Sequence, residues 1–272
     1  MPLLKQLNLQ KPCCKGGSTV KELQKDNLQV KIMPNRDEMG KIAAADIHDA
    51  IVKLLAAKDH INMIFAAAPS QNDVLAHLIR YEDIEWHRIH AFHMDEYIGL
   101  SKELADKSFG TYLHEHIFGK VPFGSVNLID ATAVDYPAEC ERYAKLLREN
   151  PTDIVVLGIG ENGHIAFNDP WIADFQDPYL VKVVPLDEVC RTQQVNDGCF
   201  ATLDLVPKYA MTLTCPALFA GKHMFCIVPA KTKAAAVKRT LEGEINADCP
   251  ATILRRHSSA VLYLDADSSS EL

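Results

Sequence analysis

The sequence has no long apolar run: none reaches the length of about 18 residues that a membrane-spanning helix requires. Its first residues, MPLLKQLNLQKPCCKGG, also lack the continuous apolar stretch and the small-residue cleavage site of a secretory signal. No long basic run stands out, and the net charge is −8, from 28 Lys plus Arg against 36 Asp plus Glu. We therefore expect a cytoplasmic protein with no membrane partner and no nucleic-acid partner.

The 8 cysteines form no C-x-x-C pair. Cys13 and Cys14 are adjacent, and the other cysteines are scattered along the chain: Cys140, Cys190, Cys199, Cys215, Cys226 and Cys249. Several lie in apolar stretches such as HMFCIVP, so we interpret them as reduced, mostly buried thiols. A different metal hypothesis uses His90, His93 and Asp95. Because side chains alternate along a strand, the odd spacing sends these two histidines to opposite faces, and we predict no metal site.

Short apolar runs alternate with amphipathic stretches along nearly the whole sequence, and DIVVLG at residues 153–158 is the clearest buried strand. Further strands are predicted at residues 28–33, 61–67, 85–94, 180–184, 210–214, 224–228 and 260–265. Helices are predicted at residues 36–57, 73–80, 109–118 (capped by Ser108), 137–148, 232–242 and 251–256. This alternation predicts an α/β fold, an open, mainly parallel, Rossmann-like sheet with helices on both faces. We expect one domain over residues 1–272, whose first ~20 residues form a loosely ordered extension.

Ligands of open α/β sheets bind beyond the carboxyl ends of the strands, which draws attention to the loop at residues 158–170, GIGENGHIAFNDP. Two glycines directly after a buried strand permit close approaches that side chains would prevent. The loop concentrates polar residues: Glu161, Asn162, His164, Asn168 and Asp169. Such a loop can hold an imidazole and a carboxylate over a ligand. The structural alternative is a tight strand-to-helix connection with a satisfied histidine.

A second predicted strand ends in HMDEY at residues 93–97. Its two carboxylates would lie at the ligand-binding edge of the sheet. Burial there raises the pKa of an aspartate and suits it to general-base work near neutral pH. The alternative is a solvated acidic turn, the usual role of an Asp-Glu pair.

Two further segments offer contacts for a phosphate. AAAPSQND at residues 66–73 follows a strand and opens a helix, where backbone N–H groups suit an anion and Ser70 and Gln71 add donors. Helix capping by Ser70 is the alternative. Lys231 and Lys233 open another helix, and each contacts either a phosphate or solvent. The sequence has neither a G-x-S-x-G elbow nor a G-x-x-x-x-G-K-[ST] loop, which disfavours serine-hydrolase chemistry and nucleotide binding.

Five segments together resemble the glucosamine-6-phosphate deaminase family: FHMDEYIGL, GIGENGHIAFNDP, VPKYAMTL, CPATILRRH and LYLDADSSSEL. The resemblance covers most of the chain from about residue 30 onward, with the motifs in the family's order. It implies a deaminating isomerase of the hydrolase class, which converts glucosamine 6-phosphate to fructose 6-phosphate and ammonia. It also implies that the enzyme needs no metal or organic cofactor, binds a small-molecule sugar phosphate, and assembles as a homo-oligomer.

The resemblance also implies a role for each matching residue. Asp95 takes the C2 proton of the substrate and returns it to C1. His164 opens the pyranose ring by moving a proton between the ring oxygen and O1, while Asn162 and Asp169 orient and polarise its imidazole. Lys233 binds the phosphate.

The chain departs from the best-known members, which have an aspartate where Asn162 stands and a glutamate where Asp169 stands. Their phosphate loop is rich in Gly and Thr, whereas this one reads APSQND. The family's phosphate-binding arginine has no counterpart at the expected place, and Arg191 or Gln194 is the substitute we consider. Regulated members carry part of an allosteric site in a C-terminal extension. This sequence ends at Leu272 without one, so we expect no allosteric control of that type.

Three alternative functions stay open. Two are enzymatic: a galactosamine-6-phosphate isomerase and a sugar-phosphate enzyme of the 6-phosphogluconolactonase kind. The third is a non-catalytic sugar-phosphate sensor, suggested by Asn162 and the altered phosphate loop. Exchange of a C2 proton with solvent distinguishes an isomerase from a lactonase, and tight binding without turnover would identify a sensor.

Overall fold

The computed structural model describes residues 20–272. In this part of the chain an 8-stranded sheet has the order β1-β2-β11-β10-β7-β3-β4-β6. Every neighbouring pair is parallel except β1 and β2. The strands are β1 (Lys21–Lys25), β2 (Leu28–Ile32), β3 (Ile61–Phe65), β4 (Ile89–His93), β6 (Ser125–Asn127), β7 (Ile154–Leu157), β10 (His223–Val228) and β11 (Ala260–Leu264). The predicted open, mainly parallel sheet is confirmed.

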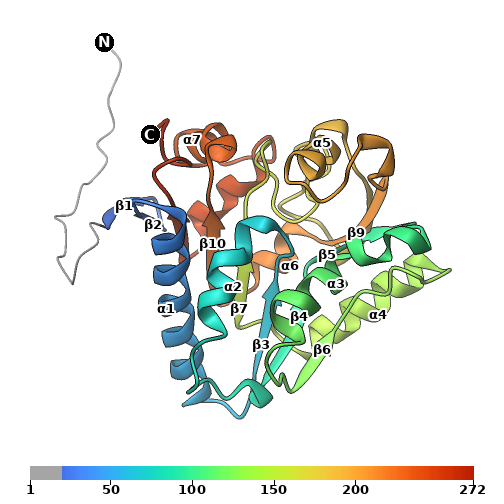
Figure 1. Cartoon of the computed structure of the whole chain (residues 1–272), viewed down its shortest axis with the longest axis horizontal. Coiled ribbons are helices and arrows are strands. Elements are labelled where there is room, and N and C mark those ends of the chain that lie inside the picture. The colour runs from blue at the N-terminus through green and yellow to red at the C-terminus, as the bar shows by residue number, and fades with distance from the viewer. Residues whose placement is uncertain (1–19) are drawn as a thin grey trace.

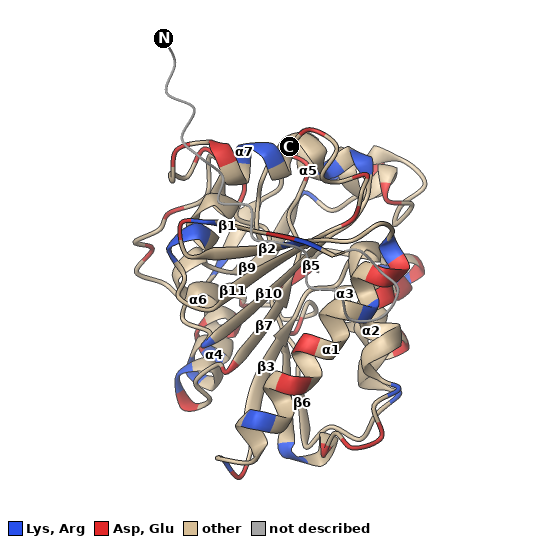
Figure 2. Cartoon of the chain, turned by 90° about the vertical axis from the view of Figure 1, so that its left-hand side faces the viewer, with Lys and Arg blue, Asp and Glu red and all other residues tan. Residues whose placement is uncertain are grey.

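Helices cover both faces of this sheet (Figure 1). One hydrophobic cluster contains side chains of α1 (Arg36–Leu55), α2 (Asn72–Leu78) and α3 (Phe109–Leu113). The other contains side chains of α4 (Tyr136–Glu149), α6 (Cys215–Phe219) and α7 (Ala234–Glu242). Successive residues of β7 alternate between the clusters, since Ile154 belongs to the first and Val155 to the second. Because β3, β7 and β10 are buried on both faces they carry no Lys, Arg, Asp or Glu, as Figure 2 shows.

Helix α1 shows how the sequence determines a covering helix. The side chain of Asn35 caps its start by accepting a hydrogen bond of 2.9 Å from the backbone N–H of Glu38. Met39, Ala43, Ile47 and Ile51 recur every fourth position and are all buried, which gives the helix one apolar stripe toward the sheet. The helix ends at Leu55, two residues before the predicted end at 57.

A second, 3-stranded sheet was not predicted. It contains β5 (Asp95–Ile98), β9 (Tyr209–Leu213) and β8 (Val181–Pro185), paired antiparallel in the order β5-β9-β8. The strands predicted near 180–184 and 210–214 therefore exist, but their assignment to the parallel sheet was wrong. One face is partly open, because Val183 and Tyr209 are exposed whereas Met211 on the same face is buried. An antiparallel sheet tolerates such a face, whereas parallel strands are usually covered on both sides.

Several predicted boundaries were also wrong. The strand predicted at 85–94 begins only at Ile89, because residues 86–88 form a 3-10 turn in which Arg88 donates hydrogen bonds to the backbone carbonyls of Leu55, Lys58 and Asp59. The segments predicted as α-helix at 251–256 and at the start of 232–242 are 3-10 turns, Pro250–Arg256 and Lys231–Lys233. The predicted cap is confirmed: Ser108 accepts a hydrogen bond from the N–H of Thr111, and α3 continues as a π-helix at His114–Phe118. Five helices and strands were missed: β1, β5, β6, α6 and α5 (Glu188–Asn196).

The predicted extension at the first ~20 residues lies almost wholly outside the described residues. That residues 1–272 form one domain stays a prediction. Among the described helices, none combines the length and apolar character needed to span a membrane.

Asp153 joins three segments at the amino-terminal edge of the sheet. Its side chain is fully buried, accepts a 3.1 Å hydrogen bond from the N–H of Asn62, and pairs with the ammonium groups of Lys58 and Lys222. Burial raises the pKa of Asp153, but the two ammonium groups outweigh it and hold this pKa below its ordinary value. A carboxyl with a lowered pKa stabilises the folded state above its unfolded-state pKa, and the contribution is lost as pH falls through the folded-state pKa.

We predict that Asp153→Asn lowers the free energy of unfolding at pH 7 by about 1–3 kcal/mol, because the buried ion pairs are lost. Urea denaturation measures the change, and the difference from wild type should shrink as the pH is lowered through the carboxyl range. Glu149→Ala serves as the control, since Glu149 pairs with Lys145 on an exposed helix face and such pairs contribute little. An equal loss in both variants would contradict the assignment.

Candidate active site

A pocket lies at the carboxyl ends of the central strands. Its wall includes residues 66–70 after β3, Met94 and Asp95 after β4, residues 158–160 after β7, and residues 229–230 after β10. This is where an open parallel sheet places its ligands. All three strand ends singled out from the sequence contribute to this wall.

Asp95 is the first residue of β5 and lines the pocket with only 6% of its surface exposed. Burial, and secondarily the charge of Glu96, raises the pKa of Asp95 well above its ordinary value. The alternative of a solvated acidic turn is therefore wrong, because Glu96 is also buried. A buried carboxyl of this kind is suited to accept a proton near neutral pH.

Glu96 has a structural task. Its carboxylate accepts hydrogen bonds from the backbone N–H groups of Tyr97 (2.8 Å), Phe109 (3.0 Å) and Gly110 (2.9 Å). Burial raises the pKa of Glu96, and these three bonds partly oppose the shift. Neighbouring His93 is fully buried 3.9 Å from Glu96, and burial lowers the pKa of His93 to about 3. His93 is therefore neutral at physiological pH.

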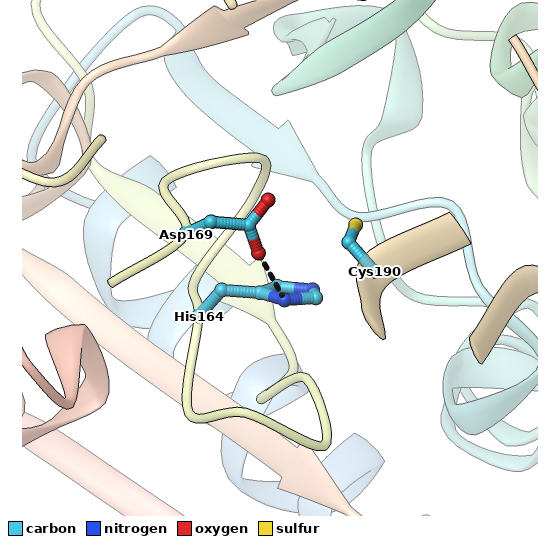
Figure 3. A group of neighbouring side chains, drawn as sticks. All are labelled: His164, Asp169 and Cys190. Atoms are coloured by element: carbon cyan, nitrogen blue, oxygen red, sulfur yellow. Dashed lines mark ion pairs between the residues drawn. The ribbon is translucent and has the colours of Figure 1, made fainter. Parts of the chain in front are cut away.

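The loop after β7 brings an imidazole, an amide and a carboxylate together. Asn162 Nδ2 donates to Asp169 Oδ1 at 2.8 Å, and Asn162 Oδ1 lies 2.8 Å from His164 Nδ1. Asp169 Oδ1 is also 3.1 Å from the same ring nitrogen (Figure 3). Because both neighbours of Nδ1 are acceptors, the network assigns the ring proton to Nδ1 and leaves Nε2 with a lone pair. The shorter Asp169 thus reaches the imidazole directly.

Asp169 remains ionised in this setting. Its burial raises the pKa, but hydrogen bonding and charge from His164, with further hydrogen bonding from Asn162, outweigh burial and hold the pKa of Asp169 below its ordinary value. The ring of His164 packs on Gly160, where an added Cβ would lie 2.1 Å from the ring. Gly163 has φ +91, which favours glycine. The loop is therefore shaped around the histidine.

Strand β9 holds both parts of the site. Thr212 is the register partner of Asp95, and its hydroxyl accepts a 3.1 Å hydrogen bond from the N–H of Phe167. The side-chain amide of Asn168 donates to the carbonyl of Leu213 at 2.8 Å. Both the strand that carries Asp95 and the loop that carries His164 are thus bonded to the same backbone.

The residues predicted to contact a phosphate fall into two groups. Ser70 and Lys233 line the pocket, and burial lowers the pKa of Lys233 against the opposing charges of Asp197 and Glu161. Gln71 is fully buried and does not line the pocket, because its amide nitrogen donates to Ser70 Oγ (2.9 Å) and to the carbonyl of Ile227 (3.3 Å).

Arg191 and Gln194 were the two candidates to replace the family's phosphate-binding arginine, and the structure places only one of them at the pocket. Arg191 donates to the carbonyls of Leu203 and Val206 and is absent from the pocket wall, whereas Gln194 lines the pocket and accepts a 2.7 Å hydrogen bond from the hydroxyl of Tyr97. Lys231 is exposed and lies outside the wall.

Arg36 was missed by the sequence reasoning. It opens α1, lines the pocket, and donates hydrogen bonds to the carboxylate of Asp73 and the carbonyl of Pro69. These bonds use two of the five N–H donors of a guanidinium. The available signal was its position directly after β2, at the same edge of the sheet as the other strand ends.

The predicted reduced thiols are confirmed for the cysteines that the structure describes. All are free, and all except the partly exposed Cys199 are buried. Cys13 and Cys14 lie outside the described residues. Cys190, on α5, has a ligand atom within 4.8 Å of those of His164 and Asp169. Burial, followed by the charge of Asp169, raises the pKa of the Cys190 thiol well above its ordinary value.

Known proteins resemble this chain in sequence and in fold. The profile of the family described as glucosamine-6-phosphate isomerases/6-phosphogluconolactonase matches residues 34–169. A glucosamine-6-phosphate deaminase of Streptococcus suis is 35% identical over 72% of this chain and 81% of its own length. Another, from Lactobacillus delbrueckii subsp. bulgaricus, is 32% identical over 90% of this chain and 100% of its own length.

Solved structures give the same result. A monomeric glucosamine-6-phosphate deaminase matches with a TM-score of 0.80 and 31% identity, covering 89% of this chain and 99% of that one. A 6-phosphogluconolactonase of Thermotoga maritima matches with a TM-score of 0.69 at 22% identity, over 87% and 98% of the two chains, and so shares the fold. The homo-oligomer expected for this chain stays a prediction.

We predict that Asp95→Asn makes the protein more stable than wild type at pH 7. A carboxyl whose pKa is raised in the folded state binds its proton more tightly there, so wild type loses stability as pH rises from the unfolded-state pKa toward the folded-state pKa. The amide carries no such cost. Urea denaturation from pH 4 to pH 8 should show a difference that grows with pH.

Asp106→Asn is the control, because the carboxylate of Asp106 is exposed and its loss should leave the pH dependence of stability unchanged. A stability difference between Asp95→Asn and wild type that is the same at every pH would show that the cost of ionising Asp95 is not its origin.

Proposed function

The chain belongs to the family of glucosamine-6-phosphate isomerases and 6-phosphogluconolactonases, and from this premise we propose that it is a glucosamine-6-phosphate deaminase. The reaction converts glucosamine 6-phosphate and one water to fructose 6-phosphate and ammonia. Because the C–N bond is finally cleaved by water, the net reaction is hydrolytic even though its central step is an isomerisation.

One observation carries the proposal. A buried carboxyl with a raised pKa, Asp95, and a hydrogen-bonded imidazole, His164, line one pocket. Coupled ring opening and isomerisation need two separate proton-transfer groups, one near C2 and one near the ring oxygen.

Ring opening is assigned to His164. With Nδ1–H held by Asn162 and Asp169, the free Nε2 takes the proton from O1 and delivers it to the ring oxygen as the ring opens. Asp169 stabilises the imidazolium that forms between these two transfers, in the way that a buried carboxylate supports a catalytic histidine. Asn162 contributes orientation, and its amide brings no charge of its own.

Isomerisation is assigned to Asp95. Its carboxylate removes the proton from C2 of the open-chain amino aldehyde, giving an enolamine as O1 takes a proton from solvent. The same carboxyl then delivers the proton to C1, which leaves an iminium ion at C2. Water adds to the iminium carbon, ammonia departs and one proton returns to solvent, producing the ketone. This scheme uses side-chain acids and bases and calls for no metal or organic cofactor.

The phosphate is assigned to three residues of the pocket wall, Lys233, Ser70 and Arg36. Lys233 and Arg36 are cations that line the pocket, and a phosphate dianion placed between them would form charge-assisted hydrogen bonds. Arg36 thereby takes the place of the arginine that other family members supply from a different segment.

The first test of the function is a coupled assay. Wild type should release ammonia and ketose phosphate from glucosamine 6-phosphate, and galactosamine 6-phosphate is run in parallel to test the isomerase alternative. Asp95→Asn should lower kcat/KM by about 100-fold to 10,000-fold, the usual range for loss of a general base. In D₂O it should also stop the exchange of the C2 proton that NMR detects with wild type.

Two outcomes would redirect the assignment. Lactone hydrolysis without C2 exchange would favour a 6-phosphogluconolactonase-like enzyme. Tight binding of an amino-sugar phosphate with neither ammonia nor ketose formed would favour a sensor.

A further prediction concerns the residues assigned to the phosphate. Arg36→Ala should raise the KM for glucosamine 6-phosphate by about 10-fold to 100-fold, the equivalent of one or two hydrogen bonds to a charged group. Its effect on kcat should be smaller, because the phosphate is remote from the reacting carbons. Steady-state kinetics measures both values.

Two controls separate binding from structure. Asp73→Asn removes the ion pair of Arg36 but keeps its guanidinium, so KM should rise much less than in Arg36→Ala. Lys238→Ala removes an exposed cation of α7 and should leave KM unchanged. A KM as high in Asp73→Asn as in Arg36→Ala would assign Arg36 a purely structural role.

A further inference from the structure

His164 lines the pocket and forms a group of ligand-type side chains with Asp169 and Cys190, which are not part of the pocket wall (Figure 3). Each offers one ligand atom, and these atoms lie within 4.8 Å of one another. His164 and Asp169 come from the loop after β7, whereas Cys190 reaches them from α5. We propose that this group binds a thiophilic divalent cation, Zn²⁺ above all, and that the bound ion holds the enzyme inactive.

An unpartnered buried oxygen is the second observation that points to a ligand. Asp169 is fully buried, and within residues 20–272 its Oδ2 makes no hydrogen bond of normal geometry, although the thiol of Cys190 and the N–H of Asp187 face the carboxylate. The other oxygen, Oδ1, already accepts from Asn162 and pairs with His164. A buried carboxylate oxygen without a partner is costly, and a cation would satisfy it.

The donor set selects the kind of ion. Imidazole nitrogen, carboxylate oxygen and thiolate sulfur are the three protein ligands that Zn²⁺ uses, and three of them with one open position make a common four-coordinate site. A thiolate disfavours Mg²⁺ and Ca²⁺, which prefer oxygen ligands. Charge also fits, because one carboxylate and one thiolate neutralise a divalent ion in a buried place. Binding displaces the thiol proton of Cys190 to solvent.

The consequence for catalysis rests on the proposed function. Asp169 lies on the Nδ1 side of His164, so an ion shared with Asp169 binds at Nδ1 and the ring proton moves to Nε2. Nε2 then has no lone pair with which to take the proton from O1. The ion would therefore abolish ring opening while leaving the fold intact. Cys190 has no part in the proposed reaction, so it can be changed without removing a catalytic group.

Metal binding is tested first, independently of any activity. Cys13 and Cys14 lie outside the described residues, so the full chain carries Cys13→Ser and Cys14→Ser to remove competing thiols. Titration with Co²⁺ should produce the near-ultraviolet absorption of a cobalt–thiolate bond with a stoichiometry of one. Zn²⁺ should displace the cobalt and Mg²⁺ should not.

Three variants in this background locate the site. Cys190→Ser and Cys190→Ala should both lose the absorption band. Loss of a residue that only hydrogen-bonds a metal ligand weakens metal binding by about 10-fold to 100-fold. Because Cys190 binds the ion directly, the Kd for Zn²⁺ should rise by more than that in both variants. Cys199→Ser is the matched control, since it removes the partly exposed thiol just beyond α5 and should keep the band. The parent of these variants is the protein that carries only Cys13→Ser and Cys14→Ser. The proposal is overturned if the parent shows no cobalt band, or if the band survives in both Cys190 variants.

Inhibition is tested second. Micromolar Zn²⁺ should lower turnover of glucosamine 6-phosphate at least 10-fold in the parent, with recovery after a chelator is added, and Cys190→Ser should be at least 10-fold less sensitive. If the parent binds cobalt through Cys190 but releases no ammonia even without metal, the proposed function fails and the metal site stands. If it is active and binds cobalt through Cys190 but Zn²⁺ does not inhibit it, the inhibitory role is wrong.

Discussion

The backbone of β9 is the constraint on which the rest of the site depends. Asp95 pairs in register with Thr212, and the loop that carries His164 is bonded to the Thr212 hydroxyl and to the carbonyl of Leu213. The large, mainly parallel sheet places the Asp95 segment and the His164 loop at the same edge. The pairing of both segments with β9 then sets the distance between them. A one-residue slip of β5 against β9 would turn Asp95 to the opposite face of the small sheet. The relative placement of Asp95 and His164, the two groups to which we assign proton transfer, therefore depends on strand pairing as well as on the loops.

The carboxyl groups of this site are buried, and the pKa of each depends on the groups that surround it. Burial and the charge of Glu96 raise the pKa of Asp95, whereas Asp169 is held ionised by His164 and Asn162. Glu96 bonds three backbone N–H groups and serves the fold. Where the best-known relatives have an acid at position 162, the amide of Asn162 donates to Asp169 and accepts from His164. Asn162 thus hydrogen-bonds the Asp169 carboxylate and places no second negative charge beside the imidazole.

The sequence predicted those parts of the structure that depend on local pattern. The apolar runs of β3 and β7 suit only strands buried on both faces, and the polar cluster after β7 identified His164 and Asp169 correctly as neighbours. The small sheet escaped prediction because the pairing of β9 with β5 joins segments more than 100 residues apart. Arg36 was missed because it reaches across 37 residues to Asp73, and Gln71 was misjudged because its amide is taken by Ser70 and Ile227. Cys190 lies on a largely polar helix that carried no motif.

The carboxylate of Glu96 also has a mechanical consequence. It binds the first two backbone N–H groups of α3 directly beside Asp95, and Phe109 at the start of α3 forms part of the pocket wall. The ring of Phe109 stacks on Phe167 of the histidine loop, with centroids 5.6 Å apart. The segment that carries Asp95, the pocket wall at Phe109 and the histidine loop are thus linked by direct contacts. If Asp95 acts as the base that we propose, a ligand too bulky for the wall would shift it out of line with the C2 proton and would be rejected through slow chemistry as well as through weak binding.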